Sequence, residues 1–147
     1  MHDSGIDRHE VTSRLAIVVG RLNRLIRPGD GFTPSQLSAL ATIARLGPMR
    51  FGDLARLETI SAPSATRLMA GLESAGYVTR TADPTDGRAV VLSATETGVA
   101  AVLEARRVRA EKLAHLLDGC SDDDIAALAA TLDLLERTVS DAAERSR

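Results

Sequence analysis

Proline and glycine interrupt the middle of the sequence so often that only short helices fit there. Two of the expected helices start at a Thr or Ser cap with a proline one or two residues later, and the same two helices end at a glycine. These breaks lie at Pro28–Gly31, Thr33–Gln36, Gly47–Pro48, Ser61–Pro63 and Gly76. The pattern predicts three short helices, beginning after Thr33, at about Gly52 and after Ser61. A tight turn over 59–61 separates the last two.

Longer helices are predicted on both sides of this segment. Apolar residues recur three and four positions apart before Pro28, at Val11, Leu15, Val18, Leu22 and Leu25. A second long helix is expected to start at a capping box, Ser93–Glu96, and to run to about Leu117. Ser121 then caps a final helix. Its apolar stripe is formed by Ile125, Leu128, Leu132, Leu135 and Val139.

The hydrophobic period changes between the third short helix and the long one. Residues 77–81 and 89–93 alternate like short strands, and residues 82–88 predict a long hairpin tip in which Gly87 suits a positive φ. Short helices joined by a tight turn and followed by a hairpin indicate a winged helix-turn-helix. The expected fold is mainly α with a small β-hairpin wing. It divides into an N-terminal dimerisation helix (1–32), a DNA-binding region (33–98) and C-terminal dimerisation helices (99–147).

Composition agrees with this class. The 147 residues are 44% hydrophobic but only 2% aromatic, so aliphatic side chains must form the core. The net charge of −2 excludes a uniformly basic nucleic-acid coat, and a basic surface must come from local placement. One cysteine, Cys120, excludes an internal disulfide and is expected to be a small buried residue. No run suits a membrane span or a signal peptide, which predicts a cytoplasmic protein.

The third short helix and the hairpin carry the candidate DNA-binding residues. A helix of this kind fits the major groove, where Arg67 can bind guanine and short hydroxyls can reach bases or phosphates. In the hairpin, an ion pair with Asp86 would fix Arg88 for insertion into a minor groove. Arg80 either braces the hairpin or contacts phosphate. The full candidate set is Pro63, Ser64, Thr66, Arg67, Arg80, Asp86 and Arg88.

Two stretches, Phe51–Arg80 and Asp83–Gly98, resemble the MarR family of bacterial transcription regulators. The more specific feature is an acid two residues before an arginine, followed by Leu92-Ser93-Ala94-Thr95-Glu96-Thr97-Gly98. The resemblance implies a homodimer that binds a pseudo-palindromic operator and regulates transcription as a repressor or an activator; of the two, we expect a repressor. It also implies that the helix over 62–75 enters the major groove, and that the arginine matching Arg88 enters the minor groove, braced by the acid matching Asp86.

Other functions are weighed against this one. Winged helices also serve as protein–protein modules without DNA binding, although no large apolar anchor faces outward from the third short helix. Enzyme motifs are lacking, the histidines have no metal-ligand spacing, and no cofactor is expected. A small effector could bind between the terminal helices and the winged core, near the end of the first helix and residues 37–43. The apolar stripes of the terminal helices predict pairing with a second copy.

Overall fold

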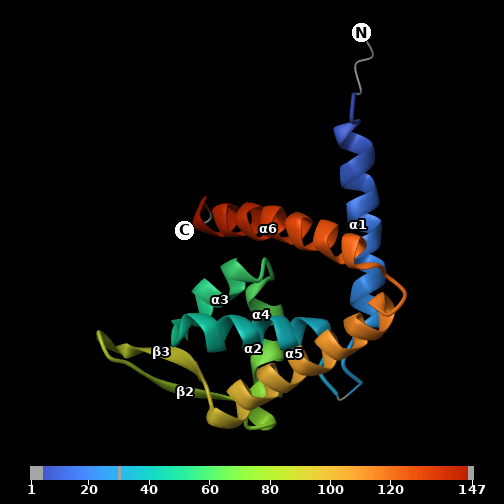
Figure 1. Cartoon of the computed structure of the whole chain (residues 1–147). Coiled ribbons are helices and arrows are strands. Elements are labelled where there is room, and N and C mark those ends of the chain that lie inside the picture. The colour runs from blue at the N-terminus through green and yellow to red at the C-terminus, as the bar shows by residue number, and fades with distance from the viewer. Residues whose placement is uncertain (1–4, 30, 146–147) are drawn as a thin grey trace. The chain divides into compact units, whose positions relative to one another are not determined.

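The computed structural model describes residues 5–29 and 31–145 and confirms a mainly helical fold with a small antiparallel wing (Figure 1). Asp30, one of the expected helix breakers, lies outside the described residues. The chain divides into two compact units between Lys112 and Leu113. Within the described ranges, no helix has both the length and the apolar character needed to cross a membrane.

The helices begin and end close to the predicted boundaries. Their bounds are α1 (Arg8–Leu25), α2 (Pro34–Leu46), α3 (Phe51–Leu57), α4 (Ala62–Ser74), α5 (Glu96–Leu117) and α6 (Asp122–Arg145). The predicted capping box of α2 is confirmed: the Gln36 N–H donates to the Thr33 hydroxyl at 3.2 Å, and the Thr33 N–H donates to the Gln36 amide oxygen at 3.0 Å. Gly47 ends α2 with a φ of 82°, a conformation that favours glycine.

The sheet has three antiparallel strands in the order β1-β3-β2. A strand of two residues, β1 (Met49–Arg50), pairs with β3 (Asp86–Ala94) and was not predicted from the sequence. β2 (Val78–Asp83) pairs with β3 from Val78 opposite Ala94 to Asp83 opposite Asp86. The predicted long tip is therefore wrong, because only Pro84 and Thr85 separate the strands. Gly87 lies within β3 and does not have a positive φ.

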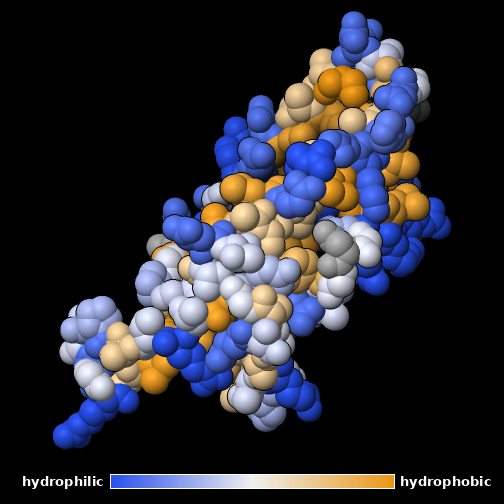
Figure 2. Space-filling model, turned by 90° about the horizontal axis from the view of Figure 1, so that it is seen from below, coloured by the Kyte–Doolittle hydropathy of each residue, from blue (hydrophilic) through white to orange (hydrophobic). Residues whose placement is uncertain are grey.

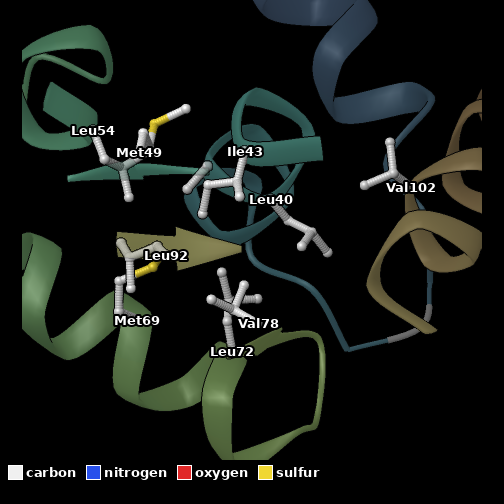
Figure 3. Packing of buried hydrophobic residues seen from close by; sticks show 10 residues of the cluster. Leu40, Ile43, Met49, Leu54, Met69, Leu72, Val78, Leu92 and Val102 are labelled. Atoms are coloured by element: carbon white, nitrogen blue, oxygen red, sulfur yellow. The ribbon is translucent and has the colours of Figure 1, made fainter. Parts of the chain in front are cut away.

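The core joins the short helices to the sheet. Figure 3 shows aliphatic and methionine side chains from these elements pointing toward one another, with Met69 of α4 beside Leu92 of β3 and Leu72 beside Val78. The only aromatic pair in the described ranges, Phe32 and Tyr77, packs at its edge with ring centroids 5.0 Å apart. An aliphatic core agrees with the scarcity of aromatic residues.

A compact junction connects the wing to α5. The Thr95 hydroxyl donates to the Gly76 carbonyl at 2.7 Å and accepts the Gly98 N–H at 3.0 Å, and the Thr95 N–H donates to the Tyr77 carbonyl at 3.0 Å. Thr95 therefore caps α5, and the predicted cap at Ser93 is wrong because β3 continues to Ala94. Gly98 permits the contact, since an added Cβ would lie 2.2 Å from the Tyr77 carbonyl oxygen.

In the second unit, α6 is capped as predicted. The Asp124 N–H donates to the Ser121 hydroxyl at 3.2 Å, and the Ser121 N–H donates to the Asp124 carboxylate at 3.0 Å, which lowers the pKa of Asp124. Cys120 is exposed, so the expected burial is wrong; it lies in the polar break between helices rather than on an apolar face.

Candidate nucleic-acid interface

The helix-turn-helix is formed by α3, a turn over 58–61 and α4. Thr59 adopts a φ of 54° in this turn, the one non-glycine residue in the described ranges with a positive φ. Ser61 caps α4 by accepting the Ser64 N–H at 3.3 Å, and Pro63 lies in the first turn. The sharp turn sets the start of α4, where residues of a recognition helix reach base edges.

The buried face of α4 determines which side chains face outward. Ala65, Met69 and Leu72 are fully buried, whereas Leu68, also predicted to face inward, is half-buried. Packing on this side leaves the opposite face free of large apolar groups. The predicted outward residues Pro63, Thr66, Arg67 and Ala70 are exposed, and Ser64 is half-buried.

The polar groups on this face are already partly engaged. The Thr66 hydroxyl donates to the Ala62 carbonyl at 3.0 Å, and the Ser61 hydroxyl donates to the Ser64 hydroxyl at 3.0 Å. Arg67 reaches the Ser64 hydroxyl only at 3.5 Å, which is a weak contact. Arg67 is therefore the group on α4 best able to offer several donors to a base, because its guanidinium is exposed and only loosely held.

An ion pair and two hydrogen bonds shape the wing tip. Arg50 donates from Nε and Nη2 to Asp83 Oδ2, at 2.8 and 2.7 Å. Asp83 Oδ1 accepts the Thr85 N–H at 2.9 Å and the Thr85 hydroxyl at 2.8 Å. Among the residues that the structure describes, Asp83 is the charged residue that is buried, with 8% of its surface exposed. The hydrogen bonds from Thr85, followed by those from Arg50, lower the pKa of Asp83 to about 2.

The predicted ion pair between Asp86 and Arg88 is not formed within the described ranges. Asp86 accepts the backbone N–H of Arg88 at 3.1 Å, and its carboxylate lies 3.9 Å from Arg50 Nη2. The strand pairing explains the difference: Asp86 and Arg88 both belong to β3, while Arg50 comes from the strand next to it. Arg88 is exposed near the tip of the hairpin.

Arg80 braces the wing against the helix-turn-helix. Its Nε donates to Glu73 of α4 at 2.7 Å, and its guanidinium lies over the Phe51 ring, 5.5 Å from the centroid. Of the two roles considered for Arg80, these contacts agree with bracing. Arg80 lies in β2, so the brace ties the hairpin to the end of α4.

A cavity of about 490 Å³ lies between the end of α1, α2 and the middle of α5. Its walls include Asn23 and Arg27 of the first helix region, Leu37 and Thr42 of α2, and Val102 of α5. Lys112 donates from Nζ to the Arg27 carbonyl at 2.6 Å, which holds the end of α1 beside α5. The location agrees with the region near the first helix and residues 37–43 that the sequence suggested for an effector.

Arg50 and Asp83 are not among the residues predicted from the sequence. Asp83 before Pro84 is a turn signal that could have identified the acid, because Asp side chains accept hydrogen bonds from the backbone two residues on. No local signal could have identified Arg50, which is 33 positions away. In the described part of the chain, no cluster of His, Cys, Asp and Glu has the composition of a metal site.

The chain is similar to known proteins both in sequence and in fold. The model of the MarR family matches residues 32–90. An uncharacterised HTH-type transcriptional regulator of Mycobacterium bovis is 40% identical over 128 residues, which cover 85% of this chain and 90% of that protein. A similarly named regulator of Mycobacterium leprae is 39% identical over the same length.

Solved structures agree in fold. A transcriptional regulator from Thermotoga maritima superposes with a TM-score of 0.74 at 25% identity, covering 90% of this chain and 96% of that one. The apo form of wild-type MarR from E. coli has a TM-score of 0.72 at 22% identity, covering 84% of this chain and 95% of that one. The latter likeness concerns the fold alone.

Proposed function

Because this chain belongs to the MarR family of helix-turn-helix transcription regulators, we propose that it represses transcription by binding a pseudo-palindromic operator as a homodimer. The observation that carries the proposal is the outward face of α4. It offers an exposed arginine among small residues, directly beside a braced wing.

In the proposed complex, α4 lies in the major groove. Its 13 residues span roughly 20 Å, long enough to follow several base pairs. Arg67 binds guanine O6 and N7 through its forked donors, while Pro63, Ser64 and Thr66 approach the backbone and base edges. The hydroxyls of Ser64 and Thr66 exchange their present partners for DNA. Small Ala62 and Ala70 allow a close approach to the groove wall.

The wing supplies the second contact. Arg88 enters the minor groove, and Asp86 supports it through the backbone N–H rather than through an ion pair. The Arg50–Asp83 ion pair holds the tip that carries both residues. Arg80 keeps the hairpin against α4, so the two DNA-binding elements keep a constant separation.

A homodimer is supported by apolar side chains that the chain leaves uncovered. No residue of α1 is buried, and the stripe residues Leu15 and Val18 are 39% and 49% exposed. On α6, Leu132 is 46% exposed and Val139 67%. Figure 2 shows hydrophobic residues (orange) at the surface on the face seen from below. Covering these stripes with a second copy places two α4 helices about one DNA turn, ~34 Å, apart or a close multiple.

Release from DNA is assigned to a small effector in the cavity between α1, α2 and α5. The cavity is bounded by α1, which we assign to the dimer interface, and by α2 of the DNA-binding region. A ligand that favours one arrangement of these elements shifts the population between operator-binding and released dimers.

The test is selection of genomic fragments by the purified full-length protein. We expect enriched duplex fragments that share an inverted repeat, salt-dependent binding, and lower transcription from a promoter carrying that repeat when the protein is added. The double variant Arg67→Ala with Arg88→Ala is the matched control and should recover no repeat. Absence of any enriched duplex would favour the protein–protein module instead, and increased transcription would contradict the repressor.

A further inference from the structure

The turn between α3 and α4 has the form of a helix end that usually carries glycine. The Thr59 N–H donates to the Arg56 carbonyl at 3.2 Å. The Ile60 N–H donates to the Ala55 carbonyl at 3.0 Å. Together these bonds make a Schellman motif, in which glycine usually takes the left-handed conformation. Here Thr59 takes it, with a φ of 54°. Because a β-branched residue disfavours this conformation, the backbone is strained just before α4.

Glu58, directly before Thr59, is held from α2. The Thr42 hydroxyl donates to Glu58 Oε1 at 2.7 Å, and both side chains are half-buried. A hydrogen bond to a carboxylate at this distance is among the stronger side-chain contacts. Glu58 lies at the C-terminal end of α3, where the helix dipole disfavours a negative charge. The bond therefore stabilises a carboxylate that its own helix does not, and it ties the turn to a residue 16 positions earlier.

α2 is a firm support for this bond. Ile43, the residue after Thr42, is 1% exposed and belongs to the same core as Leu54 of α3 and Met69 of α4. α2 contacts both of these helices. The backbone that carries the Thr42 hydroxyl is thus fixed by the core, and the hydrogen bond carries this fixed position over to the turn.

The turn decides the direction in which α4 leaves α3. Ser61, which caps α4, follows Thr59 by two residues, so a change in the Thr59 dihedrals would swing the whole helix. Binding residues need support that holds them to within about 0.5 Å of the productive geometry. We propose that Thr42 is a positioning residue for DNA recognition. Through Glu58 it holds the strained turn, and so places Arg67 against the base edges. This inference rests on the proposed function.

The first test compares two duplexes by fluorescence anisotropy of the full-length protein, the selected operator and an unrelated sequence of the same length. Thr42→Val removes the hydroxyl and keeps the shape of the side chain. We expect it to weaken operator binding about fivefold and to change binding of the unrelated duplex less than about twofold, since non-specific binding depends on phosphate charge. Unchanged operator affinity would overturn the proposal, and so would an equal loss on both duplexes.

Two further variants of α2 test the role of the hydroxyl. Thr42→Ser keeps the donor and should bind the operator within about twofold of the wild type. Ser35→Ala, which removes an exposed hydroxyl from the first turn of α2, is the matched control and should also stay within about twofold. Failure of serine to restore binding, or a loss in Ser35→Ala as large as in Thr42→Val, would contradict the assignment. Circular dichroism melting sets a temperature at which all variants are folded.

Relief of the strain separates positioning from a general contribution to stability. Thr59→Gly adopts a positive φ without the side-chain cost, so the hold from Thr42 becomes unnecessary. Adding Thr42→Val to Thr59→Gly should therefore change operator affinity less than about twofold, in place of the fivefold loss expected with Thr59 present. A full loss in the Thr59→Gly protein would mean that Thr42 does not act through the turn, and would overturn the proposal.

The wild-type measurement distinguishes this inference from the proposed function. A wild-type protein that binds its operator no better than Thr42→Val does would reject the positioning role and leave the regulator intact. A wild-type protein that selects no duplex at all would reject the regulator, and the role of Thr42 with it.

Discussion

Arg50 Nη2 lies 2.7 Å from Asp83 Oδ2, and this contact joins the two-residue strand β1 to the far end of the wing. Arg50 is half exposed and Asp83 is buried, so the Asp83 carboxylate is the more firmly held partner of the ion pair. Asp83 also binds Thr85 in the hairpin turn. The shape of the wing tip therefore depends on a residue that precedes α3, on the opposite side of the helix-turn-helix in the sequence.

Acid should weaken this arrangement in a defined pH range. The pKa of Asp83 is lowered from 3.8 to about 2 in the folded protein, so its contribution to stability is complete above the unfolded value and is lost as pH falls from about 4 through about 2. We expect the free energy of unfolding of Asp83→Asn to depend less on pH than that of the wild type in this range. Chemical denaturation at several pH values measures it; parallel curves would contradict the assignment.

Arg67→Ala should weaken operator binding by about 1–3 kcal/mol and relax the preference for one base pair in each half-site. The physical reason is the loss of forked donors to guanine. Fluorescence anisotropy with the operator and with single-base variants measures both effects. Arg107→Ala serves as the control on a different helix; equal loss of affinity for every base variant would point to a phosphate contact instead.

Arg88→Ala should weaken binding without changing the preference for major-groove bases. Because it removes one cation from the backbone and minor groove, the slope of log affinity against log salt should fall by about one. Titrations at several salt concentrations measure that slope. An unchanged slope and affinity would exclude Arg88 from the interface.

Gly98→Ala should destabilise the protein by roughly 1–3 kcal/mol or more, because the new Cβ would meet the Tyr77 carbonyl oxygen at 2.2 Å. Gly52→Ala in α3 is the matched control: nothing lies within 4 Å of the added Cβ, and alanine favours a helix. Thermal unfolding compares the two. Equal melting temperatures would contradict the close approach at Gly98.

Leu15→Glu combined with Leu132→Glu should convert the protein to a monomer that binds a half-site weakly. Charged groups would then lie on the exposed apolar stripes of α1 and α6. Sedimentation velocity at micromolar concentration gives the assembly state. Thr131→Glu, next to the stripe on α6, should leave it unchanged; a wild-type monomer at that concentration would refute the dimer.

Local chemistry determines the parts of the fold that the sequence predicts well. The capping box at Thr33, the cap at Ser61 and the glycine at Gly47 act within a few residues, and all three are confirmed. The predicted outward face of α4 is also confirmed, with Leu68 less buried than expected, because apolar spacing on a helix decides which side packs.

Contacts between distant segments explain the errors. Thr95, and not Ser93 as predicted, caps α5, because strand pairing with β2 holds the residues up to Ala94 in the sheet. The hairpin tip is shorter than predicted for the same reason. The Asp86 carboxylate lies near the Arg50 guanidinium, 3.9 Å from Nη2, and contacts Arg88 only through its backbone N–H, because β1 lies beside β3. Sequence spacing cannot show which strand will be the neighbour. The roles of the candidate residues in DNA binding stay predictions until the variants are measured.

The junction at Thr95 has a mechanical consequence. Its hydrogen bonds to Gly76 and Tyr77, with the close approach at Gly98, clamp the first turn of α5 to the segment that follows α4. The start of α5 therefore moves together with the end of α4, because the two are held in direct contact. In the proposed homodimer, a change in the distance between the two α4 helices would therefore have to come from bending or pivoting of α5 beyond this junction.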